Sequence, residues 1–149
     1  MMPQIIKVGK DDKKLISSIV EHFIETSDKQ ATSNHITKFL TDDRTHLFSA
    51  IQNDLVVGYA IVYQFPSMHD SGDLAYLYDI EVMKSQRRQG IGRQLMDVLL
   101  AHLKTIGIIE LWLGTATDNI AGQALFGSTG GIKSGETFND FTYELSPLA

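Results

Sequence analysis

A short stretch near the middle of the chain carries carboxylates at a spacing that could do chemistry. Asp79 and Glu81 lie two positions apart within the mostly apolar run Leu74–Met83. Residues two apart in a strand project to the same face, and buried carboxylates need a cation, water or a catalytic role. Unless this face is open to water, we expect the pair to have a cationic partner or a chemical role. An ion pair within the fold is the structural alternative.

The residues that follow this run form a basic, glycine-containing turn. The segment is Arg87-Arg88-Gln89-Gly90-Ile91-Gly92-Arg93, and it opens an apolar run with helical spacing. Glycine lets a backbone approach a ligand closely, and the first turn of a helix offers free N–H groups and positive potential. These features predict a pyrophosphate site, with a plain tight turn as the alternative. The Lys-Ser/Thr of a Walker loop is absent, and position 95 is Leu where a dinucleotide fingerprint has its third glycine.

The flanking elements must position these groups. Leu74–Met83 reads as a strand whose even positions are apolar or aromatic, with Asp79 and Glu81 on the opposite face. A helix to Ile106 then ends at Gly107, and Ile108–Leu113 reads as a strand. This strand, helix and strand predict a parallel pair. Asn119 is placed to cap a short helix that ends near Phe126 or Ser128.

The rest of the chain reads as scaffold. The residues predict a first strand, two helices, a hairpin with a bulge or close approach at Gly58, and two closing strands. In chain order these are Ile5–Val8, a helix capped by Asp11 or Asp12 that runs to Phe23, Thr32–Leu40, His46–Gln52 joined by Asn53-Asp54 to Leu55–Phe65, then Ile132–Ser134 and Phe141–Leu145.

Composition limits the classes of function. The 149 residues are expected to form one domain, residues 1–149, and their formal charge of −5 argues against a nucleic-acid partner. No apolar run approaches the ~18–20 residues of a membrane span, and the N-terminus lacks a signal peptide's pattern. We therefore expect a cytoplasmic protein. The absence of cysteine removes thiol nucleophiles and Cys-based zinc sites, and the five scattered histidines suggest no metal site.

The motifs together resemble those of the GNAT N-acetyltransferase superfamily. Arg87-x-x-Gly90-x-Gly92 after a strand resembles its acetyl-CoA motif, and Asn119 with Ala124-Leu125-Phe126 and Gly130 is similar to its second cofactor motif. The resemblance implies a mixed α/β fold: a mostly antiparallel sheet of six or seven strands with a splayed parallel pair, and about four helices. Within the superfamily, Val56-Val57-Gly58, Leu77–Ile80 and Arg87–Ile91 are most similar to the aminoglycoside 3-N-acetyltransferases.

The resemblance also assigns roles to residues of this chain. It implies direct acetyl transfer from acetyl-CoA to a primary amine on a small molecule, such as an aminoglycoside or polyamine, in a protein that is commonly a homodimer. Asp79 is the first candidate for the base and Glu81 the second, and a backbone N–H near Val82 would polarise the thioester. The residues implied to line the cofactor site are Val82, Met83, Arg87, Arg88, Gln89, Gly90, Ile91, Gly92, Arg93, Asn119 and Phe126.

Two departures from the family pattern concern the second motif. Phe126 stands where many members have a tyrosine that protonates the leaving thiolate, so water, Tyr78 or Tyr143 would have to serve. Gly131 stands where an aromatic residue is usual. Phe126 also favours an alternative function, a catalytically silent CoA-binding regulatory domain. A nucleotide-binding α/β module that uses the same turn is a further alternative.

Overall fold

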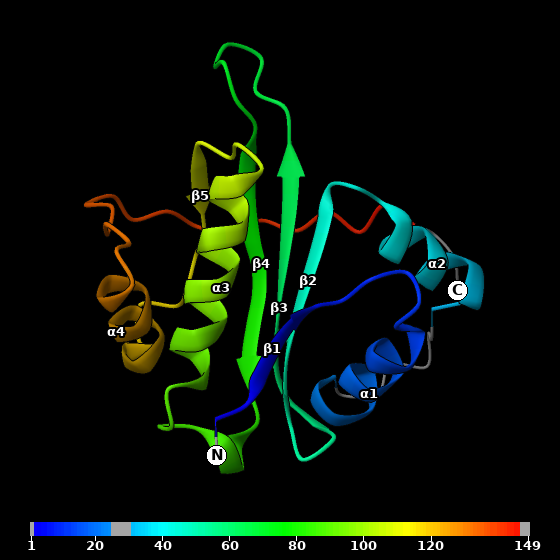
Figure 1. Ribbon diagram of the computed structural model, residues 1–149. Helices are drawn as coiled ribbons and strands as arrows, with labels where there is room; N and C mark the ends of the chain where they lie inside the picture. The colour runs from blue at the N-terminus through cyan, green and yellow to red at the C-terminus, as the bar shows by residue number, and fades with distance from the viewer. Residues whose placement is uncertain (1, 25–30, 147–149) are drawn as a thin grey trace.

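A computed structural model describes residues 2–24 and 31–146, which form one five-stranded sheet with helices on both faces (Figure 1). The strands lie in the order β1-β2-β3-β4-β5. Neighbours are antiparallel except β4 and β5, which are parallel as predicted. The bounds are β1 Gln4–Lys7, α1 Lys13–Phe23, α2 Ser33–Thr41, β2 Thr45–Gln52, β3 Leu55–Phe65, β4 Leu74–Val82, the 3-10 turn η1 Lys84–Gln86, α3 Ile91–Thr105, β5 Glu110–Trp112 and α4 Ile120–Ser128.

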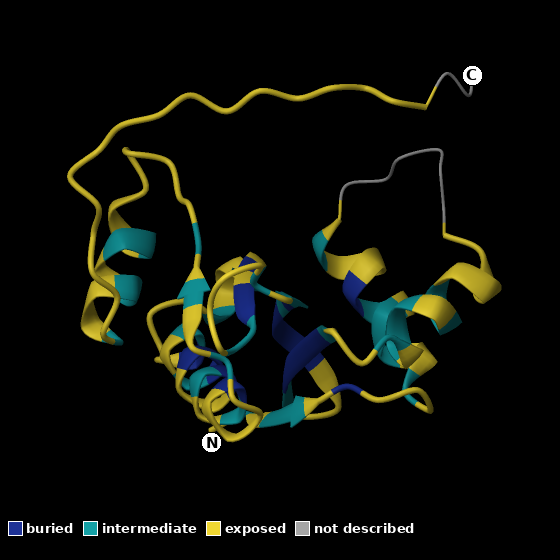
Figure 2. Ribbon diagram, turned by 90° about the horizontal axis from the view of Figure 1, so that it is seen from above, coloured by how far each residue is buried: buried dark blue, intermediate teal, exposed yellow. Residues whose placement is uncertain are grey.

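Two hydrophobic clusters hold the helices against the sheet. On one face, Leu95 and Leu99 of α3 pack against buried side chains of β2, β3 and β4. On the other face, Ile19 of α1 and the partly buried Phe39 of α2 pack around Tyr59. Figure 2 shows these buried segments at the centre of the molecule. The helical spacing of the apolar residues explains both layers, because each helix presents one apolar stripe to the sheet. No helix of the described ranges combines the length and apolar content that crossing a bilayer requires.

The β2–β3 hairpin forms where the sequence predicts it. Asn53 and Asp54 have φ angles of 53° and 62°, and two positive φ values in a two-residue loop are those of a type I′ turn. Gly58 opposes Ala50, whereas Val56 opposes Ile51, so Val57 is an extra residue on β3. The predicted bulge beside Gly58 is therefore confirmed.

A second bulge changes the orientation of β4. Asp79 opposes Ile61, but Leu77 opposes Val62, so Tyr78 is the extra residue. Ala75 and Leu77 before the bulge and Ile80 after it pack on the α3 side. The expectation that the even positions of this strand share one face is therefore wrong, because the bulge shifts the alternation by one residue.

The parallel strands β4 and β5 are paired over a short length only. Their register begins at Leu74 with Glu110 and ends at Tyr76 with Trp112. The strand β5 is thus shorter than the predicted Ile108–Leu113. Beyond Tyr76, β4 and β5 are no longer paired. The α3 helix ends before Gly107, whose φ is 84°. The predicted splayed pair and the four α-helices are present.

The two closing strands do not form. Residues 132–134 and 141–145 have no strand assignment, and the sheet has five strands instead of six or seven. Ile132 and Phe141 are 97% and 83% exposed. An apolar run gains strand structure only by hydrogen bonding to a neighbouring strand, and this segment runs clear of the sheet (Figure 2). Its apolar pattern identifies a strand-like segment but not a partner.

Candidate active site

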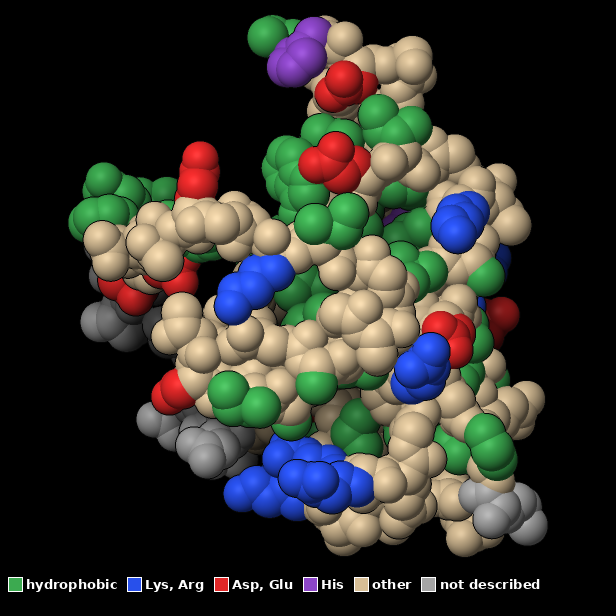
Figure 3. Space-filling view, turned by 90° about the vertical axis from the view of Figure 1, so that its left-hand side faces the viewer, with side chains coloured by type: hydrophobic (Ala, Val, Ile, Leu, Met, Phe, Trp, Pro, Cys, Tyr) green, Lys and Arg blue, Asp and Glu red, His purple; other side chains and the backbone are tan. Residues whose placement is uncertain are grey.

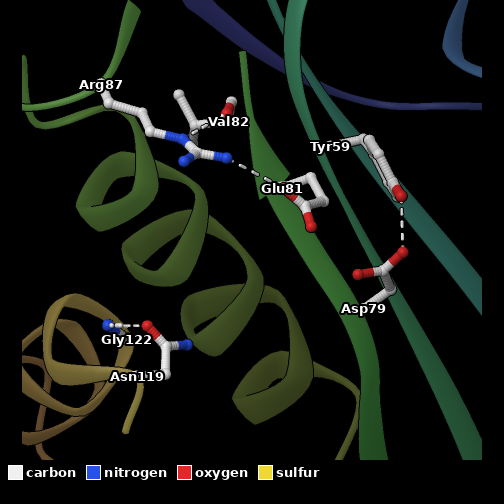
Figure 4. A network of polar contacts seen from close by, with 7 residues as sticks. All are labelled: Tyr59, Asp79, Glu81, Val82, Arg87, Asn119 and Gly122. Carbon is white, nitrogen blue, oxygen red and sulfur yellow. Dashed lines mark hydrogen bonds and ion pairs between the residues drawn. The ribbon is translucent and has the colours of Figure 1, made fainter. Parts of the chain in front are cut away.

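Asp79 is held by a tyrosine from the neighbouring strand. The Tyr59 hydroxyl donates a hydrogen bond to Asp79 Oδ2 at 2.5 Å. Both side chains lie on the α1–α2 side of the sheet (Figure 4). Burial, and then the hydrogen bond to Asp79, raises the pKa of Tyr59 far above its usual value, so the hydroxyl stays protonated. One carboxylate oxygen of Asp79 is thus fixed by a neutral donor, and the other can bind a further group.

Glu81 differs from Asp79 because its carboxylate has a cationic partner. Glu81 Oε2 lies 3.4 Å from the Arg87 guanidinium, whose Nε also donates to the Val82 carbonyl at 2.9 Å (Figure 4). About half of each charged side chain is exposed, so this pair adds roughly 0–1 kcal/mol of stability. The ion-pair alternative therefore describes Glu81, which leaves Asp79 as the stronger candidate for the base.

A small cleft opens where β4 and β5 separate. It has a volume of about 200 Å³ and is bounded by β4, by the loop after β5 and by α4. Its lining residues are Leu77, Tyr78, Asp79, Ile80, Glu81, Leu113, Gly114, Thr115, Asn119 and Phe126. Both carboxylates therefore meet Asn119 and Phe126 of the second motif at one site.

At the end of β4, one residue directs its backbone N–H and C=O toward the edge of the strand that borders the cleft. The N–H and C=O of one residue point to the same edge of a strand, and successive residues alternate between the two edges. The Met83 N–H donates to the Val57 carbonyl at 2.8 Å, toward β3, so the N–H and C=O of Val82 point to the opposite edge. The Val82 carbonyl accepts from Arg87 there. Val82, not Met83, therefore has an N–H directed toward the gap between the strands.

The basic turn after β4 has a strained and open backbone. Arg88 and Gly90 have φ angles of 63° and 81°. Gly90 is the residue before α3, and a Cβ built on it would meet nothing within 4 Å. No side chain caps the helix there, and in the described structure Arg88 makes no hydrogen bond or ion pair. Figure 3 shows Lys and Arg side chains gathered at this lower end of the molecule. The turn therefore fits a pyrophosphate, which would contact backbone N–H groups and arginine side chains.

The other residues predicted to line this turn have different environments. Gln89 is exposed, whereas the Ile91 side chain is fully buried under the sheet. A Cβ on Gly92 would lie 3.2 Å from Leu125 Cδ2, so this glycine lets α4 approach α3. The Arg93 guanidinium donates to the Ser128 carbonyl at the end of α4, at 3.4 Å. Gly92 and Arg93 thus join the two helices of the predicted cofactor motifs.

Asn119 is the predicted cap of α4 and also lines the cleft. Its Oδ1 accepts from the Gly122 N–H at 3.0 Å (Figure 4). Its Nδ2 donates to Thr115 Oγ1 at 2.8 Å. Phe126, about two helical turns further on, is partly buried against the α3 side of the core. Asn119 and Phe126 therefore shape the wall opposite Asp79.

Two residues of the site were not expected from the sequence. Tyr59 lies 20 residues before Asp79, and its contact depends on the β3–β4 register, which local patterns do not give. Thr115 contributes a hydroxyl from the loop after β5. A polar loop residue after a parallel strand was a usable signal for Thr115, because loops at that strand end carry many ligand contacts.

Acidic side chains in the loops before β2 and β4 have polar partners within the fold. Asp42 pairs with Arg44, Asp70 accepts from Ser67, and Asp73 accepts from Gln64. Within the described residues there is no group of three or more His, Cys, Asp or Glu side chains that could hold a metal ion.

A mixed sheet with a splayed parallel pair, a basic turn at a helix start and a carboxylate in the gap are the features that the resemblance to acetyltransferases implies. The sequence profile described as the acetyltransferase (GNAT) family matches residues 14–130. The chain belongs to this family of N-acetyltransferases.

Relatives and similar structures agree with this assignment. A ribosomal protein bS18-alanine N-acetyltransferase of Escherichia coli is 31% identical over 109 residues, which are 73% of this chain and 66% of that protein. The chain thus matches just under two thirds of this relative's length. An aminoglycoside acetyltransferase from an uncultured soil sample, solved with sisomicin, has a TM-score of 0.87 at 21% identity and 97% coverage of both chains. An aminoglycoside N-acetyltransferase solved with CoA has a TM-score of 0.72 at 17% identity, covering 95% of this chain and 99% of that chain.

Proposed function

We propose that this protein transfers an acetyl group from acetyl-CoA to a primary amine of a small polyamine or aminoglycoside-like molecule. One observation carries the proposal. Asp79, oriented by Tyr59, faces the cleft. The strand that carries it, β4, continues directly into the basic turn. A carboxylate for the amine and an anion site for the donor are thus joined by a few residues of β4. Direct transfer is favoured because the chain has no cysteine to carry an acyl group.

The donor would be held by the turn and by the edge of β4. Acetyl-CoA supplies the acetyl group as an activated thioester. Arg88 and the N–H groups beside Gly90 would bind its pyrophosphate, and the Val82 peptide would bind the pantetheine arm. Arg87 keeps the β4 end in place through its bonds to Val82 and Glu81. Phosphate oxygens bind most strongly to such charge-assisted donors.

Asp79 would bind the amine and start its deprotonation. Amines are mostly ammonium ions near neutral pH, and an ammonium cannot attack a carbonyl. With Oδ2 occupied by Tyr59, Oδ1 is available to accept a hydrogen bond from the substrate. A carboxylate with a reference pKa of about 3.9 is a weak base for an amine. Asp79 would therefore orient the ammonium and pass its proton to water.

The Val82 N–H would stabilise the negative charge that develops on the thioester oxygen. This backbone donor is fixed by the sheet, because the neighbouring Met83 N–H is bonded to Val57 at 2.8 Å. A donor that is already oriented needs no rearrangement during the reaction, and removing one such donor typically costs roughly 10²–10³ in rate. The geometry of β4 thus supplies this function without a side chain.

The leaving thiolate has a candidate proton donor in Tyr78. Phe126 lines the cleft and has no proton to donate. Tyr78 lines the same cleft, is exposed, and packs its ring edge-on against Tyr63. Tyr143 lies in an exposed segment after α4 and does not line the cleft. A thiol pKa near 8.5 also makes the free thiolate a tolerable leaving group.

Two amine classes compete for the role of substrate. The structural neighbours include aminoglycoside acetyltransferases, and the sequence relative acts on the alanine of a ribosomal protein. We favour a small polyamine, because Asp79 and Glu81 both line the cleft of about 200 Å³, Asp79 with one oxygen available and Glu81 in an exposed pair with Arg87. A multiply charged small amine can use both, whereas a protein N-terminus offers one ammonium.

A CoA-binding regulatory domain is the second candidate, and the presence of Phe126 in the cleft favours it. Two measurements on the purified chain separate the functions. Acetyl-CoA binding is followed by calorimetry, and thiol release is followed with aminoglycosides, polyamines, amino acids and an alanine-initiated peptide. Binding with turnover of a polyamine or aminoglycoside supports our proposal. Binding without turnover of any amine favours the regulatory domain, and absence of binding contradicts both.

A further inference from the structure

We propose that the sheet carries a second amine-binding site, which holds the distal ammonium group of a linear polyamine while its reacting nitrogen lies at Asp79. The site consists of aromatic side chains on β3, β4 and β5 and of the carboxylate of Glu110 on β5. The inference rests on the proposed function, because it assigns a position to the rest of that substrate. It also names the residues that would favour a linear polyamine over other amines.

Aromatic side chains lie side by side across three strands, on the face of the sheet opposite α3. Tyr63 of β3 opposes Tyr76 of β4, and Tyr76 opposes Trp112 of β5. Ala75 and Leu77, the neighbours of Tyr76, pack on the α3 side. Because successive residues of a strand alternate between its faces, the Tyr76 side chain points away from α3. These three residues form the centre of an aromatic row.

Two further residues complete the aromatic row. Tyr78 packs edge-on against Tyr63, with ring centroids 5.5 Å apart. Phe65 lies beside Trp112, with ring centroids 6.1 Å apart. Tyr76, Trp112 and Tyr78 are 39%, 47% and 64% exposed, respectively. Exposed apolar patches commonly mark binding sites, and aromatic faces attract cations. The row therefore fits a chain in which methylene groups alternate with ammonium groups.

Glu110 places a carboxylate at the far end of the aromatic row. It opposes Leu74 of β4 and shares a face with Trp112, two residues later. Trp112 Nε1 donates a hydrogen bond to Glu110 Oε1. Glu110 is exposed, and it forms no ion pair with any residue that the structure describes. One oxygen is thus held by an aromatic donor and the other is available to a cation, as in the contact of Asp79 with Tyr59.

The spacing of the two carboxylates matches an extended polyamine. Asp79 lies five residues after Leu74, the partner of Glu110, which separates the two carboxylate residues by roughly 15 Å along the strand at ~3.3 Å per residue. Tyr78 and Tyr76 lie between them on β4. A short monoamine bound at Asp79 would not reach the far carboxylate. An extended spermine chain is of similar length to the gap, and its inner ammonium groups would lie over the aromatic rings.

Two ligands of equal chain length isolate the distal ammonium group in the unmodified protein. Decamethylenediamine and decylamine have the same methylene chain, but only the diamine has a second ammonium group. With CoA present, calorimetry should show the diamine binding about 3–10-fold more tightly, as an exposed ion pair and a cation–π contact together provide. Affinities that differ by no more than the statistical advantage of two equivalent ends, or no binding of either ligand, would overturn the proposal.

Substitutions then locate the distal site. Glu110→Gln removes the charge, and Trp112→Leu removes the ring. Each should lower kcat/KM for spermine, relative to that for propylamine, by about 3–10-fold. Asp97→Asn is the matched control, because Asp97 is an exposed carboxylate on α3, which covers the opposite face of the sheet. It should leave this ratio unchanged. Thermal unfolding checks that each variant is folded.

The outcomes separate this inference from the proposed function. Absence of turnover with every amine would contradict acetyl transfer, and the calorimetric comparison, which needs no turnover, would still decide the distal site. Turnover of spermine with the same ratio in both variants would overturn the inference and leave the proposed function intact. A loss confined to sisomicin would assign the aromatic row to sugar rings and would also overturn it. If Trp112→Leu fails to fold, Glu110→Gln and the comparison of the two ligands decide.

Discussion

Tyr59 on β3 and Asp79 on β4 are joined by a hydrogen bond of 2.5 Å from the tyrosine hydroxyl to Asp79 Oδ2. Tyr59 is nearly fully buried, and Phe23 packs edge-on against its ring with a centroid distance of 5.1 Å. The tyrosine therefore has little freedom to move, and it fixes the rotation of the carboxylate. This contact distinguishes Asp79 from Glu81, whose carboxylate pairs with Arg87 instead.

Replacement of Asp79 should stop turnover without loss of the donor. Asp79→Asn keeps the size of the side chain and removes its charge, so the amine is neither bound as an ammonium nor deprotonated. We expect kcat/KM for the amine to fall by about 10²–10⁴, with the affinity for acetyl-CoA unchanged by calorimetry. Glu81→Gln is the control, and it should cost less because Glu81 is paired with Arg87. Equal losses for both variants would contradict the assignment of Asp79.

Loss of the tyrosine hydroxyl should act through Asp79. Tyr59→Phe leaves the ring packing intact and removes the donor to Oδ2. We expect KM for the amine to rise more than kcat falls, because the carboxylate then rotates freely. The free energy of unfolding should fall by about 1 kcal/mol. Tyr63→Phe on the same strand is the matched control, since Tyr63 contacts the Tyr78 ring and not Asp79. An unchanged KM in Tyr59→Phe would show that the hydrogen bond is only structural.

Arginine substitutions should separate anion binding from support of the strand. Arg88→Ala removes a charge that contacts no other described side chain, so we expect weaker acetyl-CoA binding at unchanged stability. The loss should shrink as salt is added, because exposed charges are screened. Arg93→Ala serves as the comparison, because Arg93 bonds to the end of α4, and its change should lower the melting temperature instead. Calorimetry at two salt concentrations and thermal unfolding measure both effects.

Local signals in the sequence predict much of this fold because they depend on neighbouring residues. Asn53 and Asp54 define the hairpin turn by their tolerance of positive φ. Asn119 caps α4 through the N–H three residues later. Each of these contacts closes within a few positions, so a residue type and a spacing are sufficient to indicate it.

Contacts between distant segments could not be predicted in the same way. The β4 bulge at Tyr78 is a property of the β3–β4 register, and it alone decides which side chains of β4 share a face. The Tyr59–Asp79 contact depends on the same register. The segment Phe141–Leu145 has the pattern of a strand, but alternation contains no information about the edge with which a strand pairs. The motif around Gly90 and Gly92 predicts a donor site at this turn, but it does not indicate that Gly92 lies against Leu125 of α4.

Two glycines of α4 should respond in opposite directions to alanine. A Cβ on Gly122 would lie 2.3 Å from Asn119 Nδ2, whereas a Cβ on Gly127 would meet nothing within 4 Å. Gly122→Ala should displace the capping side chain and lower the free energy of unfolding by about 0.5–2 kcal/mol. Gly127→Ala should raise it by up to about 1 kcal/mol, because alanine favours the helix. Urea unfolding measures both changes, and a loss in both variants would contradict the account of the cap.

A buried histidine away from the cleft should make stability depend on pH. His46 is 4% exposed, and its Nε2 bonds to Gln64 Oε1 at 2.8 Å. Gln64 donates its own amide to Asp73, so its oxygen accepts, and His46 carries its proton on Nε2. The Nδ1 atom is buried without a partner in the described structure. A second proton would therefore be placed where nothing can accept it.

Burial is the main cause that lowers the pKa of His46. The hydrogen bond to Gln64 is the next largest effect and raises it, the charge of Lys7 lowers it, and the charge of Asp42 raises it slightly, so the net shift is downward. The unfolded chain, with a histidine pKa near 6.5, then binds a proton at a higher pH than the folded chain. Stability is therefore complete above about pH 6.5 and falls as the pH decreases toward the folded pKa. Urea unfolding between pH 5 and 7.5 should show this slope. His46→Gln should reduce this slope. The His102 ring centroid lies 5.5 Å from that of His46, and burial also lowers the pKa of His102. The double change His46→Gln with His102→Gln should therefore reduce the slope further. A slope that is the same in all three proteins would assign the pH dependence to other groups.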